Sequence, residues 1–166
     1  MKAKTSKQKG NEGERFVKEL AEAHQYICDV HPRTFKQYTR PDNKTYWMSS
    51  ENDFFGCGDL ICVSKDDALM PQVTHAGNEG HKPKDMDNDF PIDNPNFRLV
   101  VFKLWKEPVK INNRKSEKYF YSVKERIERG IWLDVSWITR DRIKEVWEKY
   151  NGDLSKMPFP TPQKKS

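Results

Sequence analysis

The spacing of apolar residues predicts one helix near each end of the chain. The first spans residues 10–26, and the second starts after Thr139, a suitable N-cap, and stops at Gly152. In both segments the apolar side chains recur at helical spacing, which places them on one face. These positions are Phe16, Val17, Leu20, Ala21 and His24 in the first helix and Ile143, Val146, Trp147 and Tyr150 in the second.

Runs of apolar and β-branched residues between these helices predict strands. They are residues 33–38, 54–63, 69–74, 97–105, 118–123 and 131–138. A short turn joins the second and third of them, so these two are expected to pair as a hairpin. Ser122 followed by Glu125 is a capping-box pattern, which predicts a short helix ending at Gly130. This order of elements predicts an α/β fold in which helices flank a mixed sheet.

A length of 166 residues fits one domain with a looser segment at each end. Residues 1–9 are basic and polar and predict a disordered arm. The domain proper is expected to cover residues 10–152. Within it, residues 76–96 are acidic, contain glycine and proline and lack periodicity, so they predict a long loop. Residues 153–166 are expected to form a tail.

The net charge of +5 is concentrated at the two ends of the chain. Residues 1–10 carry four lysines and no acidic residue, whereas the loop at 76–96 has five acidic residues against two lysines. Basic ends on a body of mixed charge favour a polyanionic partner such as nucleic acid. Tails that only increase solubility are the alternative interpretation.

Composition also indicates where the chain resides. No apolar run is long enough to cross a membrane, and the basic N-terminus is not followed by the apolar stretch of a secretory signal. The three cysteines, Cys28, Cys57 and Cys62, have no framework spacing, so reduced thiols are expected. The sequence therefore predicts a cytoplasmic protein with no membrane partner.

Asp59 is the strongest candidate for a chemical role. It follows two glycines, Gly56 and Gly58, and directly precedes a buried strand, so its carboxylate is expected at the mouth of that strand. In a tight hairpin Gln72 comes to lie beside it, and Glu14 on the first helix can point to the same edge. Hard oxygen ligands gathered in this way suit Mg²⁺ and metal-assisted hydrolysis of phosphodiesters.

Two segments resemble the PD-(D/E)xK nucleases, in particular the archaeal Holliday-junction resolvases. Residues 9–16, Lys-Gly-Asn-Glu-Gly-Glu-Arg-Phe, resemble the opening of that family, and residues 54–61, Phe-Phe-Gly-Cys-Gly-Asp-Leu-Ile, resemble the strand that carries its first acidic motif. Residues 72–74, Gln-Val-Thr, fall where the family has Glu-x-Lys. The likeness covers residues 9–75; from 97 to 138 it lies only in the order of the elements.

The resemblance implies a restriction-endonuclease-like sheet and a Mg²⁺- or Mn²⁺-dependent endonuclease for branched or structured DNA, acting as a homodimer. It places Glu14, Asp59, Gln72 and the carbonyl of Val73 around the metal, with Thr74 at the position of the catalytic lysine. The basic residues near the N-terminus, Lys7, Lys9 and Arg15, are expected to contact DNA.

The chain departs from the family pattern at two positions. Gln72 is neutral where a carboxylate is expected, and Thr74 replaces the lysine. The candidate substitute cations are Lys65, His75, Lys82 and Lys84. Two hypotheses therefore stay open: a nuclease with a variant site, and a nuclease-like fold that binds DNA or a protein without catalysis.

Two structural alternatives also remain. Asp59 can cap a turn or pair with Arg33 or Arg40. Cys57 and Cys62 together with His75 or His81 can be read as zinc ligands, although their spacing matches no regular zinc pattern.

Overall fold

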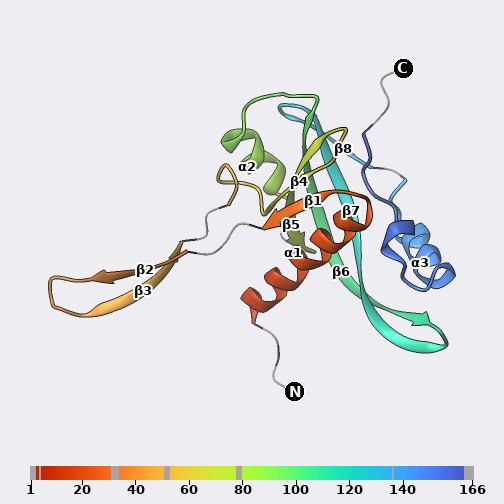
Figure 1. Cartoon of the computed structure of the whole chain (residues 1–166), viewed down its shortest axis with the longest axis horizontal. Helices are drawn as coiled ribbons and strands as arrows, with labels where there is room; N and C mark the ends of the chain where they lie inside the picture. The colour runs from red at the N-terminus through yellow and green to blue at the C-terminus, as the bar shows by residue number, and fades with distance from the viewer. Residues whose placement is uncertain are drawn as a thin grey trace.

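A six-stranded mixed sheet forms the centre of the computed structural model, which describes residues 3, 5–30, 34–50, 53–77, 80–135 and 137–162 (Figure 1). In spatial order its strands are β1 (Ile27–Val30), β4 (Leu60–Val63), β5 (Ala68–His75), β6 (Phe97–Ile111), β7 (Arg114–Glu128) and β8 (Ile131–Asp134). β5 and β6 pair in parallel, and the other neighbours pair antiparallel. β2 (Thr34–Thr39) and β3 (Thr45–Ser50) form a separate hairpin. The expected mixed α/β architecture is confirmed.

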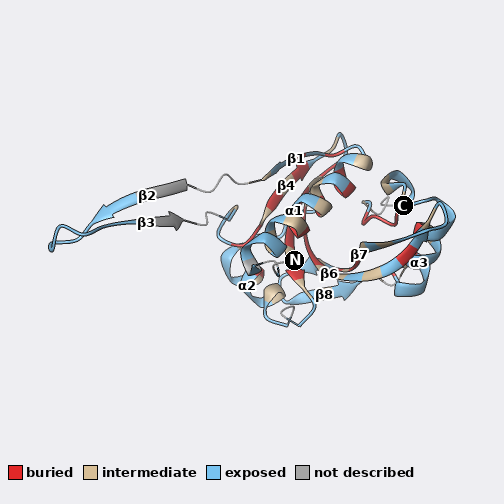
Figure 2. Ribbon diagram, turned by 90° about the horizontal axis from the view of Figure 1, so that it is seen from below, coloured by how far each residue is buried: buried red, intermediate tan, exposed pale blue. Residues whose placement is uncertain are grey.

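Helices cover both faces of this sheet (Figure 2). α1 (Ser6–Ala23), α3 (Arg140–Lys149) and the segment after the 3₁₀ turn η1 (Leu154–Lys156) pack on one face and form the larger core. α2 (Lys82–Asp89) packs on the other face over a smaller core. Leu99 to Phe102 of β6 alternate between these two cores, so this part of the strand is buried on both sides.

α1 begins earlier than its apolar pattern predicts. Thr5 is the N-cap, and its hydroxyl accepts from the backbone N–H of Gln8 while the Gln8 side chain accepts from the N–H of Thr5. Residues 6–9 are therefore helical, and the expectation of a disordered arm over residues 1–9 is wrong for that part. Residues 6–9 have no apolar face from which a helix could be predicted. The capping box of Thr5 and Gln8 starts the helix instead.

The acidic segment at 76–96 contains α2, so the expectation of an unbroken loop is wrong. Pro83 occupies the first turn, and Met86 is fully buried against the sheet. The buried guanidinium of Arg126 pairs with Asp87 and Asp93, each at 3.4 Å. The negative charge of this segment is thus partly neutralised within the fold. Residues 78 and 79 lie outside the described residues.

The long hairpin of β6 and β7 replaces a predicted helix. Asn112 and Asn113, both with positive φ, form the turn between the strands. β7 stays paired with β6 or β8 along its length, so the short helix expected from Ser122 to Gly130 is wrong. Ser122 and Glu125 do not start a helix, because the backbone N–H and C=O groups around them form hydrogen bonds to the neighbouring strands instead.

Cys28 and Cys62 form a disulfide between β1 and β4, whereas Cys57 is a buried free thiol. The two bonded residues lie directly opposite each other in the antiparallel ladder. The expectation of reduced thiols is wrong for this pair, because pairing of the strands brings together cysteines that are distant in sequence. The disulfide also removes Cys62 from the zinc interpretation.

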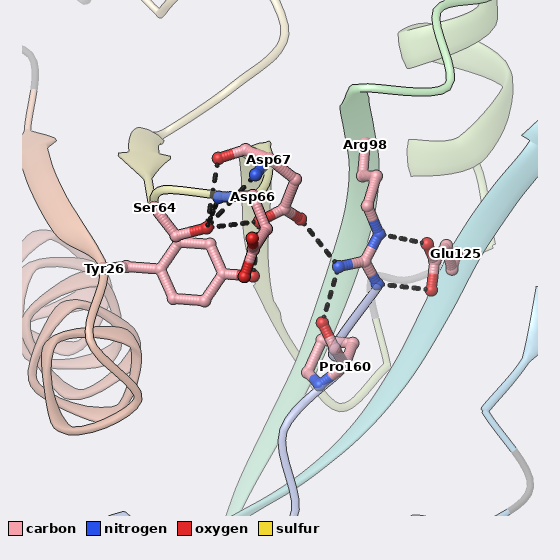
Figure 3. Close-up of polar contacts among 7 residues, drawn as sticks. All are labelled: Tyr26, Ser64, Asp66, Asp67, Arg98, Glu125 and Pro160. Carbon is pink, nitrogen blue, oxygen red and sulfur yellow. Dashed lines mark hydrogen bonds and ion pairs between the residues drawn. The ribbon is translucent and has the colours of Figure 1, made fainter. Parts of the chain in front are cut away.

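A buried ionic network joins the C-terminal segment to the sheet (Figure 3). Arg98 of β6 donates to both carboxylate oxygens of Glu125, at 2.6 and 2.9 Å, and to Asp67 at 2.9 Å. It also donates to the carbonyl of Pro160 at 2.8 Å, and Tyr26 donates to Asp67 at 2.8 Å. Two carboxylates and a carbonyl thus satisfy one buried guanidinium.

The segment expected to be a tail, residues 153–166, is in part a component of the core. Met157 and Phe159 are buried, and the hydroxyl of Tyr121 donates to the carbonyl of Pro158. The prediction is wrong up to residue 160, since only the folded sheet offers these partners. Residues 163–166 lie outside the described residues. Within the described part of the chain, no helix is long and apolar enough to cross a membrane.

Candidate active site

Asp59 lies at the start of β4, opposite Gln72 of β5. The β4–β5 ladder pairs Cys62 with Leu69, and beyond it the backbone N–H of Asp59 donates to the carbonyl of Pro71, the residue before Gln72, at 3.0 Å. The Gln72 side chain donates through Nε2 to Asp59 Oδ2 at 2.7 Å. The backbone N–H of Val73 donates to the same oxygen at 2.6 Å. The predicted juxtaposition of Asp59 and Gln72 is confirmed.

A tight turn before β4 directs the Asp59 carboxylate. Phe54 and Gly58 form an isolated bridge, and Phe55 and Gly56 between them have positive φ. A side chain at Gly58 would collide with that of Met70, so only glycine allows the turn to approach β5 this closely. The glycines before Asp59 therefore place its carboxylate against the neighbouring strand.

Burial raises the pKa of the Asp59 carboxyl to about 7, against the effect of the Val73 N–H, which stabilises the charged form. The negative charges of Glu14 and Asp53 raise this pKa further, and the positive charge of Lys82 lowers it. Three acidic groups and one lysine are thus electrostatically coupled at one end of the sheet. A buried carboxyl with a raised pKa beside other acids is typical of functional sites.

Close packing of α1 on the sheet brings Glu14 to this edge. A Cβ at Gly13 would come within 3.0 Å of Leu104 Cδ1 and 3.2 Å of His75 Nε2. The ring of His75 also lies 3.1 Å from the carbonyl oxygen of Lys9. The glycine next to Glu14 therefore allows the first half of α1 to rest on the ends of β5 and β6.

The remaining predicted positions lie on β5. Thr74 is buried and follows Gln72 by two residues, so both are on the face that carries α2. Val73 was expected to contribute its carbonyl, but the contact it makes with Asp59 is through its N–H. In the parallel ladder Thr74 pairs with Lys103 of β6. Neighbours in register project to the same face of a sheet, so Lys103 belongs to the same surface as Thr74.

Sequence reasoning missed two charged residues of this site, Lys103 and Asp53. Lys103 lies on a strand that was predicted, but its position beside Thr74 depends on the register of a parallel pair far apart in sequence. Asp53 is the acidic residue just before the turn that leads to β4. Because Asp53 lies three residues before Gly56, its position in the sequence could have placed it near Asp59.

The four substitute cations have different environments. Lys82 is the first residue of α2, and its positive charge lowers the pKa of Asp59. Lys65 is exposed in the turn joining β4 to β5, at the opposite end of β4 from Asp59. Lys84 is exposed on α2, and His75 contacts the N-terminal part of α1.

The predicted DNA-contacting residues lie on α1. Lys7 and Lys9 are exposed in its first turns rather than on a disordered arm. Arg15 is exposed and forms an ion pair with Glu19 at 2.8 Å.

Of the alternative partners of Asp59, Arg40 lies over the ring of Tyr46 in the β2–β3 hairpin, and Arg33 is outside the described residues.

The residues at this edge offer a divalent metal carboxylate and amide oxygens. Among the described residues, no group of three or more His, Cys, Asp or Glu side chains is arranged to hold a metal ion. The carboxylates of Asp59 and Glu14 nevertheless suit Mg²⁺, which proteins commonly hold through one or two carboxylates together with water and substrate phosphate. Gln72 can add an amide oxygen after rotating its side chain, because its nitrogen now faces Asp59.

Comparison of the chain with protein-family models, with curated proteins and with solved structures gives no match.

Proposed function

We propose that this protein is a metal-dependent endodeoxyribonuclease that hydrolyses phosphodiesters in branched or structured DNA, with a restriction-endonuclease-like sheet. The observation that carries the proposal is the environment of Asp59: a half-buried carboxylate, oriented by Gln72 and Val73, with Glu14 and Asp53 close enough to raise its pKa. The mixed sheet with helices on both faces supports it, as do the segments that resemble the resolvases.

In this proposal Asp59 and Glu14 hold Mg²⁺ or Mn²⁺, which when bound would supply an activated water and stabilise charge on the phosphate. Gln72 and the N–H of Val73 keep the Asp59 carboxylate in one orientation. Lys103 and Lys82 supply positive charge for the phosphate, and exposed Lys7 and Lys9 approach the DNA backbone. A homodimer would present two such sites to the two strands of a branched DNA.

The proposal is tested by cleavage of a DNA panel. Labelled four-way junction, flap, duplex and single-stranded DNA are incubated with the protein in Mg²⁺, Mn²⁺ or EDTA. We expect cleavage of branched DNA in the presence of either metal and none in EDTA. Absence of cleavage on every substrate in both metals would reject the nuclease assignment.

Gln72→Glu should tighten Mg²⁺ binding by roughly tenfold, because it adds a second full negative charge directly beside Asp59. Isothermal titration calorimetry measures the affinity. Gln72→Leu is the control, since it retains much of the volume but removes the oxygen, and it should bind no more tightly than the wild-type protein. An unchanged affinity in Gln72→Glu would contradict the placement of the metal at this edge.

Lys103→Met should lower the cleavage rate at saturating Mg²⁺ by on the order of 100-fold while leaving Mg²⁺ affinity within a few-fold of wild type. Its position beside Thr74, two residues beyond Gln72 on the same face, is the reason. Lys82→Met is the matched comparison, because Lys82 is the other lysine at this edge. Wild-type rates in Lys103→Met, with a loss in Lys82→Met, would assign the role to Lys82 instead.

One observation favours the alternative function, a nuclease-like fold that binds DNA without hydrolysing it. Gln72 is neutral and donates its amide nitrogen to Asp59, so the structure presents an internally satisfied pair. A protein of this kind would bind branched DNA equally well in Mg²⁺ and in EDTA and would not cleave it. The cleavage panel therefore separates the two functions.

A further inference from the structure

The β2–β3 hairpin extends away from the rest of the molecule as an arm (Figures 1 and 2). Its strands pair only with each other, from Thr34 opposite Ser50 to Thr39 opposite Thr45, and do not join the six-stranded sheet. An isolated two-stranded hairpin is marginally stable in water. Because the described side chains of the arm, residues 37–46, are all exposed, a role in contacting a partner is the simplest reason for the arm.

One face of the arm combines aromatic rings with positive charge. Tyr38 and Tyr46 lie opposite each other, with ring centroids 6.1 Å apart and planes inclined by 25°. The guanidinium of Arg40 lies 5.0 Å from the centroid of the Tyr46 ring. The two tyrosines are 45% and 38% exposed, although large apolar rings are usually more buried. Lys44 adds a second exposed cation in the connecting turn.

Close to its turn, the other face of the arm is polar. Gln37, Thr39 and Thr45 alternate with the tyrosines along the two strands and are exposed. Gln37, Thr39 and Thr45 therefore provide a matched control for the two tyrosines, at the same level of the arm.

We propose that the face formed by Tyr38, Arg40, Lys44 and Tyr46, the stacking face, binds unpaired bases of branched DNA. The inference rests on the proposed function, which supplies DNA as the partner. Bases stack on tyrosine rings without regard to sequence, and arginine adds cation–π and phosphate contacts. Such stacking selects exposed bases over paired ones, because the faces of bases within a duplex are already covered.

Charge and chain order favour DNA over a protein partner. Between residues 37 and 46, Arg40 and Lys44 outnumber the single acid, Asp42, and an excess of positive charge suits a polyanionic partner. β3 ends at Ser50, and the next described segment leads through the turn at Phe54 to Asp59. A base held by the arm is thus bound by the same stretch of chain that carries the candidate site.

The test measures DNA binding in EDTA, so that cleavage cannot contribute. Fluorescence anisotropy compares a labelled three-way junction, with unpaired bases at its branch point, and a duplex of equal strand length. We expect Tyr38→Ser/Tyr46→Ser to weaken junction binding at least roughly tenfold and duplex binding by less than threefold. Tyr38→Phe/Tyr46→Phe keeps the rings and should bind both DNAs like the wild-type protein.

Two further variants distinguish loss of the stacking face from unfolding of the whole arm. Gln37→Ser/Thr45→Ser alters the opposite face at the same positions along the strands and should leave junction affinity unchanged. Arg40→Ala should weaken junction binding and reduce the slope of log affinity against log salt by about 0.7 to 0.9. Junction affinity lost in the opposite-face variant as well would overturn the assignment to the stacking face.

Other outcomes separate this inference from the proposed function. Unchanged junction affinity in the serine variant, with cleavage by the wild-type protein, overturns the role of the arm alone. No DNA binding by the wild-type protein overturns both. Equal losses on junction and duplex exclude stacking on unpaired bases. Dissociation of a dimer in the serine variant, measured by sedimentation with unchanged DNA affinity, would make a second copy of the chain the partner of this face.

Discussion

Asp59→Asn is expected to reduce metal-dependent cleavage by on the order of 10³-fold while leaving the fold intact. The substitution keeps the size of the side chain and an oxygen that can accept from the Val73 N–H, but it removes the half-buried charge that would hold the metal. Cleavage of junction DNA and Mg²⁺ calorimetry measure the loss, and circular dichroism checks the fold. Activity near the wild-type level in a folded Asp59→Asn protein would exclude the site.

The same substitution should stabilise the metal-free protein at neutral and alkaline pH. The pKa of Asp59 is about 7 in the folded state, against an ordinary value of 3.8. The folded state therefore binds more protons than the unfolded chain between pH 4 and 7, so this carboxyl costs stability progressively as pH rises through that window. At pH 8 in EDTA, Asp59→Asn should unfold with a free energy on the order of 1–3 kcal/mol higher than wild type, and the difference should vanish near pH 4.

Denaturant titration at the two pH values checks this expectation. Asp66→Asn is the matched control, because Asp66 is exposed. The gain of Asp59→Asn between pH 4 and pH 8 should exceed any change seen in this control. A gain of equal size at pH 4 and pH 8 would show that the charge of Asp59 is not what destabilises the fold.

Arg98→Met is expected to lower the free energy of unfolding by about 3–5 kcal/mol, the largest stability effect foreseen for this chain. The guanidinium is buried, and its removal takes away the hydrogen bonds that it donates to Asp67 Oδ2 and to the carbonyl of Pro160. Glu125 loses both of its hydrogen bonds to Arg98 at the same time. Denaturant unfolding followed by tryptophan fluorescence measures the change.

Arg15→Met serves as the control because it removes an arginine from an exposed ion pair. Arg15 and Glu19 form a contact of 2.8 Å, but 80% of the Arg15 side chain is exposed. Such pairs contribute roughly 0–1 kcal/mol. Similar losses in the two variants would mean that the network around Arg98 is not what joins the C-terminal segment to the sheet.

The sequence by itself determined the local features of the candidate site. The glycines before Asp59 and the short turn at residues 64–67 are sufficient to predict that Asp59 and Gln72 face each other, because a tight hairpin leaves little choice of register. The helical spacing of apolar residues and the cap at Thr139 likewise predict α3 at its observed start. These features depend on residues close together in the chain.

Only the tertiary structure decided the features that depend on distant partners. The position of Lys103 beside Thr74 follows from a parallel pairing across α2, whose register no local pattern specifies. The Cys28–Cys62 disulfide and the contacts of Arg98 with Asp67, Glu125 and Pro160 also join residues far apart in sequence. The predictions of a helix at 122–130 and of a C-terminal tail are wrong for the same reason. Pairing with distant strands takes up the backbone groups of β7, and burial against distant residues holds Met157 and Phe159 in the core, and neither partner can be read from a local pattern.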